Sequence, residues 1–83
     1  MKVSVRYFAS LREALGAGES VEVPPGTTLG GLRDQLVGSS ERHAVVLARG
    51  RTVRCALDQA MSAEEVLLRE GAEVAFFPPV TGG

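Results

Sequence analysis

Apolar and polar residues alternate near both ends of this 83-residue chain. An alternation with a period of two predicts a β-strand with one buried face, so we expect a first strand over residues 2–8 and a last strand over residues 72–77. The side chains expected on the buried face are those of Val3, Val5, Tyr7, Val74 and Phe76. Both segments should belong to one sheet, and this requirement most strongly limits the folds open to so short a chain.

The segments that follow the first strand predict a helix, a strand and a second helix. A short helix should end at Gly16, where a glycine follows the last apolar residue, and a second strand should cover residues 19–23 before a Pro-Pro-Gly turn. The main helix should begin after Thr27 or Thr28 and end near Gly38. We expect Arg33, Asp34 and Gln35 on its solvent side. Its apolar stripe is formed by Leu29, Leu32, Leu36 and Val37.

The second half of the chain is less clearly patterned. Residues 41–48 fit helix and strand templates about equally, and we favour a helical turn. Residues 51–57 predict a third strand. Ser62 and Glu65 have the spacing of a capping box, which predicts a helical turn from there to Gly71. One face of the third strand should point to the core, and this face is formed by Val53, Cys55 and Leu57.

Together these elements predict an α+β fold, a small mixed sheet of four to five strands with one main helix packed on one face. The other face of the sheet should be open. Because side chains alternate between the two faces of a strand, Phe8 and Phe77 should stand on that open face. Isolated surface aromatics are common, but two of them together favour a surface that binds a partner.

Composition argues against several classes of function. The formal net charge of −1 attracts neither nucleic acid nor an anionic membrane. One cysteine and one histidine leave no disulfide, no CxxC pair and no zinc site. No apolar run approaches a membrane span, and the N-terminal segment lacks a signal-peptide pattern. We therefore expect a cytoplasmic protein without a metal site.

The C-terminal segment offers a reactive group. A proline pair follows Phe77 and should end the sheet, dividing the chain into a domain of residues 1–77 and an extended tail of residues 78–83. That tail reaches at most about 20 Å, and its two terminal glycines make it thin. Its carboxylate needs activation before it can react, and the chain has no phosphate-binding loop of its own. An ATP-using partner would have to adenylate it, unless the tail is simply a frayed end.

Two stretches carry a resemblance to a known family. VAFFPPVTGG, residues 74–83, resembles the C-terminal signature of the small, sulfur-carrying subunit of molybdopterin synthase. VRYFASLRE, residues 5–13, resembles the opening strand and turn of the same MoaD/ThiS-like sulfur carriers. The match extends over essentially the whole chain. It implies a ubiquitin-like β-grasp fold with a flexible Gly-Gly tail.

The resemblance also implies a sulfur carrier rather than an enzyme. In this family, an adenylyltransferase related to ubiquitin-activating enzymes uses ATP and Mg²⁺ to adenylate the terminal glycine, which becomes a thiocarboxylate. The large subunit of molybdopterin synthase, in a heterotetramer, then directs the sulfur to cyclic pyranopterin monophosphate. This step builds the dithiolene of molybdopterin in molybdenum cofactor biosynthesis. The carrier itself is expected to bind no cofactor stably.

By position, Gly83 is the residue expected to carry the sulfur. The tail that would deliver it comprises Pro78, Pro79, Val80, Thr81 and Gly82. The apolar residues that match the family's contact surface for partners are Phe8, Met61 and Phe77. Three other functions stay open: a carrier for thiamine, cysteine or tRNA thiolation, a ubiquitin-like protein modifier, and a non-covalent binding module.

The remaining candidates have simpler explanations. Arg49, Arg51 and Arg54 form a local basic cluster that could meet an acidic partner, although we expect at least the first two to keep a turn solvated. Cys55 shares the parity of core residues and should be an inert buried thiol. His43 should be exposed near a helix end without a chemical role.

Overall fold

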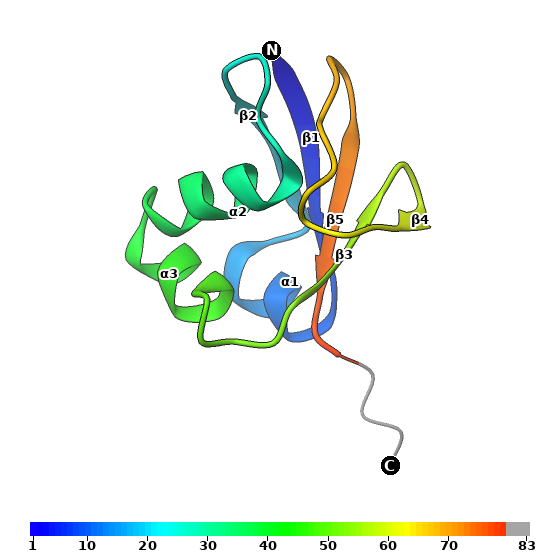
Figure 1. The fold of residues 1–83 in the computed structure, drawn as a ribbon. Coiled ribbons are helices and arrows are strands. Elements are labelled where there is room, and N and C mark those ends of the chain that lie inside the picture. Colours follow the sequence, from blue (N-terminus) through cyan, green and yellow to red (C-terminus); the bar gives the residue numbers. More distant parts are fainter. Residues whose placement is uncertain (80–83) are drawn as a thin grey trace.

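The computed structural model describes residues 1–79, in which helices cover one face of a sheet (Figure 1). The strands are β1 (Lys2–Tyr7), β2 (Gly18–Glu22), β3 (Arg54–Leu57), β4 (Ala60–Met61) and β5 (Glu73–Phe77). The helices are α1 (Ala9–Leu15), α2 (Leu29–Val37) and α3 (Glu41–Leu47). The predicted α+β class is confirmed, and α1 and α3 complete the layer around the longest helix, α2.

The five strands form one mixed sheet in the order β2-β1-β5-β3-β4. β1 and β5 are parallel, with Val5 opposite Val74, and each of the other neighbouring pairs is antiparallel. Because β1 and β5 run in the same direction, the N-terminus lies at one end of the sheet and β5 leads out at the other (Figure 1). The tail therefore leaves the domain far from Met1.

The core lies between the sheet and the helices. Buried and exposed residues alternate strictly along β1, and β5 shows the same period, which confirms the parity predicted for both strands. Val5, Val74 and Phe76 are almost completely buried. The helices contribute the buried residues Leu11, Leu29, Leu32, Leu36 and Leu47. Each buried leucine of this kind stabilises the fold by about 1.5–3 kcal/mol.

The predicted helix boundaries hold where a cap fixes them. Thr28 precedes α2, and its Oγ1 accepts a hydrogen bond of 3.0 Å from the backbone nitrogen of Gly31. α1 ends at Gly16, whose φ of +92° suits glycine. The ambiguous segment after residue 40 is a helix, because Ser40 Oγ accepts from the backbone nitrogen of His43 at 3.2 Å and caps α3.

The helical turn predicted from Ser62 to Gly71 is wrong. Ser62 Oγ donates to the carbonyl of Ala63, so it does not cap a helix. The carbonyls of Glu64 and Val66 instead accept hydrogen bonds of 2.9 and 3.0 Å from the first two backbone nitrogens of α2. The segment lies along the beginning of α2. Its carbonyls accept hydrogen bonds from backbone N–H groups that have no partner within the helix, as at the N-terminus of every helix.

The strands of the second half also differ from the prediction. β3 begins at Arg54 rather than at residue 51, and it forms a hairpin with the unexpected strand β4. Asp58 and Gln59 make the turn with φ values of +49° and +72°, the left-handed conformation of a tight hairpin turn. Asp58 Oδ1 accepts from the backbone nitrogen of Glu73 at 3.0 Å and ties this hairpin to β5.

Candidate functional site

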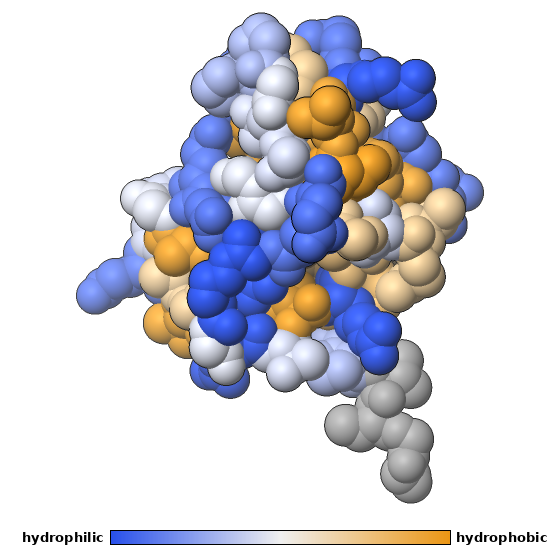
Figure 2. All heavy atoms as spheres, viewed as in Figure 1, coloured by the Kyte–Doolittle hydropathy of each residue, from blue (hydrophilic) through white to orange (hydrophobic). Residues whose placement is uncertain are grey.

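The open face of the sheet carries a groove that contains the three predicted contact residues. Its volume is about 430 Å³. The groove is lined by Arg6, Phe8, Ala56, Gln59, Met61, Glu73, Ala75 and Phe77. Phe8 is 41% exposed and Met61 is 61% exposed, whereas Phe77 is half-buried. Figure 2 shows weakly apolar residues around β4, on the side of the molecule away from the helices.

Three different strands position these side chains. Phe8 follows β1, and its backbone nitrogen donates to the carbonyl of Phe76 at 3.1 Å, which fixes it beside the end of β5. Phe77 is the last residue of β5 and pairs with Arg54 in the register of β3 and β5. Met61 belongs to β4 and pairs with Ala56. The structure thus brings Phe8 together with two residues that lie more than fifty positions later in the sequence.

Charged groups flank the aromatic residues of this groove. The guanidinium of Arg6 lies 5.9 Å from the centre of the Phe8 ring, a cation–π arrangement. The same guanidinium lies 3.7 Å from Glu73 Oε2. On the other flank, Arg54 is exposed beside Phe77. The groove therefore has an apolar centre with polar edges, as a surface that binds another protein requires.

The tail begins at this end of the sheet. Pro78 and Pro79 follow β5 and line a second groove, of about 380 Å³, together with Leu11 of α1, Val46 of α3 and residues 51–53 of the loop before β3. The predicted tail residues Val80, Thr81 and Gly82 and the predicted reactive residue Gly83 lie outside the described residues. Their proposed roles therefore stay predictions.

A buried arginine holds the loop that leads to β3. Arg33 Nε donates to the carbonyl of Leu47 at 2.7 Å, and Nη2 donates to those of Ala48 and Arg51 at 2.9 and 3.0 Å. Nη1 donates to Glu64 Oε2 at 2.9 Å. Arg33 is only 4% exposed, so the prediction that it lies on the solvent side of α2 is wrong. Its position four residues after Leu29, on the apolar stripe, was the signal that could have revealed this.

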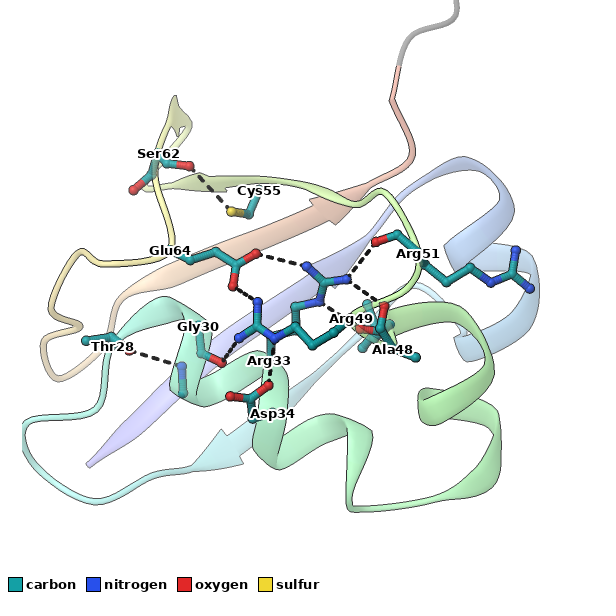
Figure 3. Close-up of polar contacts among 12 residues, drawn as sticks. Thr28, Gly30, Arg33, Asp34, Ala48, Arg49, Arg51, Cys55, Ser62 and Glu64 are labelled. Carbon is teal, nitrogen blue, oxygen red and sulfur yellow. Dashed lines mark hydrogen bonds and ion pairs between the residues drawn. The ribbon is translucent and has the colours of Figure 1, made fainter.

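Arg49 completes this network from the other side of Glu64 (Figure 3). Its guanidinium donates to Asp34 Oδ1 at 2.9 Å, to the carbonyl of Gly30 at 3.1 Å and to Glu64 Oε1. Burial alone would raise the pKa of Glu64, but the hydrogen bonds from Arg49 and Arg33 lower it below its ordinary value. Arg49 therefore does more than solvate a turn, which corrects the prediction made for it.

A second polar chain connects the sheet to α3. Tyr7 Oη donates to Glu19 Oε2 at 2.7 Å, and His43 Nε2 lies 2.7 Å from the same oxygen. Ser40 Oγ lies 2.6 Å from His43 Nδ1. The His43 side chain is only 16% exposed, so the prediction of an exposed histidine is wrong. Burial and the hydrogen bond to Glu19 raise the pKa of Tyr7. The row of contacts from Tyr7 through Glu19 to His43 holds α3 against the sheet.

Cys55 does not take part in the site. Its side chain is buried, and Sγ donates to the carbonyl of Ser62 at 3.4 Å. Burial raises the pKa of the thiol and keeps it protonated, which confirms the predicted core role. Within residues 1–79, no group of three or more His, Cys, Asp or Glu side chains could hold a metal ion. None of the described helices is long and apolar enough to cross a membrane.

Comparison with known proteins decides the family. The model of the ThiS family matches residues 5–83. The chain belongs to the ThiS family. Among curated members of similar length, the molybdopterin synthase sulfur carrier subunit of Escherichia coli is 36% identical over 98% of this chain and 99% of its own length. The subunit of the same name from Mycobacterium tuberculosis is 38% identical over 100% of this chain and 99% of its own.

Solved structures agree with this assignment to the ThiS family. SAMP1 from Haloferax volcanii superimposes with a TM-score of 0.81 at 28% identity, and the match covers 100% of both chains. A complex of subunits 1 and 2 of the molybdopterin-converting factor from Helicobacter pylori contains a chain that matches with a TM-score of 0.69 at 25% identity, again over 100% of both chains. The predicted ubiquitin-like β-grasp fold is thereby confirmed.

Proposed function

We propose that this protein is the sulfur carrier subunit of molybdopterin synthase. In this proposal Gly83 is adenylated, converted to a thiocarboxylate, and used as the sulfur donor for cyclic pyranopterin monophosphate. The observation that carries the proposal is the groove on the open face of the sheet, where Phe8, Met61 and Phe77 lie near the end from which the tail leaves. The names of the curated relatives, which match over the whole chain, indicate which synthase is served.

The position of the groove explains how a partner could receive the tail. Phe77 is the last residue of β5, so a protein that covers the groove also meets Pro78 and Pro79. Docking on the groove would guide residues 78–83 into the partner, where they can reach about 20 Å. The contacts that Phe8 and Phe77 make with the partner would thereby position the carboxyl group of Gly83, which is not itself part of the groove.

The chemical roles divide between this chain and its partners. This chain supplies one reactive group, the carboxyl of Gly83, which is ionised at neutral pH and unreactive until an oxygen becomes part of a leaving group. A ubiquitin-activating-like adenylyltransferase would bind ATP and Mg²⁺ and form the adenylate. The large subunit would bind the pterin and supply the acid and base. The carrier is thus a non-catalytic subunit, placed in the cytoplasm with no stably bound cofactor.

Mass spectrometry tests the first half of the proposal. The chain is incubated with a sulfur-carrier adenylyltransferase, ATP and a sulfide source, and its C-terminal fragment is analysed. We expect replacement of one oxygen by sulfur at Gly83, and none in a chain that lacks Gly82 and Gly83. Localising the change to Gly83 is essential, because oxidation of Met61 or Cys55 gives nearly the same mass. A plain carboxylate, with the enzyme shown to be active on another carrier, would overturn the proposal.

Transfer to the pterin tests the second half. The thiocarboxylated chain is mixed with the large subunit of molybdopterin synthase and cyclic pyranopterin monophosphate, and molybdopterin is measured. Product formation that depends on Gly83 would support the assignment to this synthase. Efficient thiocarboxylation without molybdopterin formation would instead favour a carrier for thiamine, cysteine or tRNA thiolation. Gly-Gly remnants on target lysines would favour a protein modifier.

A further inference from the structure

The basic residues of this chain are almost all arginine. Lysine and arginine number nine, and because Lys2 is the one lysine, eight are arginines. The two side chains have equal charge but different reactivity. A lysine ammonium titrates near a pH of about 10.4, so a small neutral fraction can attack an acyl group at neutral pH. A guanidinium stays protonated and does not react in this way.

The amines of the chain lie at the end of the sheet opposite to the tail. Lys2 begins β1, which runs parallel to β5. Phe8 lies beside the end of β5, and the six residue-to-residue steps from Lys2 to Phe8 correspond to about 20 Å of strand. The α-amino group of Met1 lies at the same far end, where it donates to the carbonyl of Val23 at 2.8 Å.

The length of the tail keeps its end away from these amines. Pro79 lies beyond the end of β5, and the four residues that follow span at most about 14 Å. The terminal carbon therefore stops short of the level of Lys2. The side chain of Lys2 stands roughly perpendicular to its strand and shortens this gap little.

Two arginines stand where a lysine would be within reach. Arg54 is paired with Phe77 across β3 and β5, so it neighbours the residue from which the six-residue tail departs. Arg51 lines the groove that also contains Pro78 and Pro79. Both residues are exposed, and Arg51 Nε donates to the carbonyl of Val45 at 3.1 Å. The Arg54 side chain has no hydrogen bond or ion pair within the part of the chain that the structure describes. Each could be replaced by lysine without loss of charge.

We propose that arginine rather than lysine at positions 51 and 54 prevents the activated carboxyl of Gly83 from acylating its own chain. This inference rests on the proposed function, in which Gly83 becomes an acyl-adenylate. A nearby neutral lysine amine would attack the Gly83 carbonyl carbon. The bond from that carbon to the adenylate oxygen would break, AMP would leave, and solvent would take up the proton of the amine. The resulting amide would remove the tail from sulfur transfer.

A thioester at Gly83 tests this inference without any activating enzyme. The full chain is produced with a small-thiol thioester by intein cleavage, and the products of its decay are identified by mass spectrometry. In the wild type we expect hydrolysis to the free acid. In Arg54→Lys and Arg51→Lys we expect a second product, lighter than the free acid by one water, with an amide between Gly83 and the introduced lysine. The bond from the carbonyl carbon to sulfur breaks, and the thiol leaves.

Arg69→Lys is the matched control, because Arg69 is exposed near the turn before β5, at the far end of the sheet. A link of six residues gives an effective amine concentration in the millimolar range, so at ~10 μM protein the internal reaction should exceed the intermolecular one by roughly 100-fold. The amide in Arg54→Lys should therefore form at a rate that dilution does not change.

The inference is overturned if Arg54→Lys and Arg51→Lys form no more internal amide than Arg69→Lys, or if the wild type acylates Lys2 or Met1 within its own chain. Because the thioester is made without an adenylyltransferase, either result leaves the proposed function untouched. That function fails separately, when no thiocarboxylate forms at Gly83.

Discussion

Replacing Arg33 with methionine should be among the most damaging single changes outside the apolar core. Methionine retains most of the aliphatic stem but removes every donor. The carbonyls of Leu47 and Arg51 then lose their hydrogen bonds, and the Ala48 carbonyl keeps only the one from the Arg51 backbone nitrogen. Glu64 loses one of its two arginine partners. All four partners lie around a guanidinium that is 4% exposed, so water replaces the lost donors poorly.

The magnitude follows from these bonds. A buried carbonyl left without its donor costs about 1–3 kcal/mol, but the neighbouring carbonyls of Leu47 and Arg51 can share an entering water, so the costs do not add fully. Removing one member of a buried ion pair costs about 3–5 kcal/mol, and because Glu64 keeps Arg49 as a partner we expect Arg33→Met to lie at the lower end, about 3 kcal/mol. A domain of this length has a total stability of roughly 4–12 kcal/mol. The substitution should therefore remove a large part of the stability.

Urea unfolding followed by circular dichroism measures this loss directly. In a parallel thermal unfolding measurement the midpoint should fall by roughly 12–24 °C, because a loss of 1 kcal/mol shifts it by about 4–8 °C in a domain of this size. Arg69→Ala serves as the control, since Arg69 is exposed and should change the stability by less than about 0.5 kcal/mol. A loss below about 1 kcal/mol for Arg33→Met would refute the reasoning, because water would then be replacing the hydrogen bonds that Arg33 donates.

Three further predictions concern pH, partner binding and backbone strain. The hydrogen bonds from His43 and Tyr7 outweigh burial and lower the pKa of Glu19, so its stabilising contribution is complete above its ordinary pKa of about 4.5 and is lost as the pH falls through the lower folded value. Urea unfolding at a series of acidic pH values should therefore show a flatter acid limb for Glu19→Gln; an unchanged limb contradicts this. Met61→Asp should weaken binding to the large subunit about 30-fold or more. Thermal stability should stay unchanged, because Met61 is 61% exposed. If calorimetry gives a dissociation constant within about threefold of the wild type, the groove is not the binding surface. Gly16→Ala should cost about 1–3 kcal/mol because its φ is +92°, whereas Gly50→Ala, in open space, should be neutral by the same unfolding assay; equal effects would exclude backbone strain as the cause.

The elements that the sequence predicted well are those with a strict period or a local cap. The alternation of Val3, Val5 and Tyr7 requires only that one face of the strand is buried, and this is what the structure shows. The end of α1 at Gly16 and the start of α2 at Thr28 depend on neighbouring residues alone. The open face followed from the same parity, so the place of the aromatic groove was predictable as well.

The elements that were missed depend on contacts between distant segments. The Ser62 to Gly71 segment has a helical signature, but its carbonyls and Glu64 are used by α2 and by two arginines that lie far away in the sequence. A local signal worth about 1 kcal/mol cannot compete with several charge-assisted hydrogen bonds. His43 was missed for the same reason, since its partner Glu19 belongs to β2.

The arginine network and the tail are connected through the start of β3. Arg33 binds the carbonyls of residues 47, 48 and 51, which fixes the loop immediately before Arg54. Arg54 in turn pairs with Phe77, the residue from which the tail leaves. Loosening the network should therefore disturb the base of the tail before it disturbs Met1, which is hydrogen-bonded to Val23, the residue after β2. The residues that stabilise this domain thus also determine where its C-terminal tail begins.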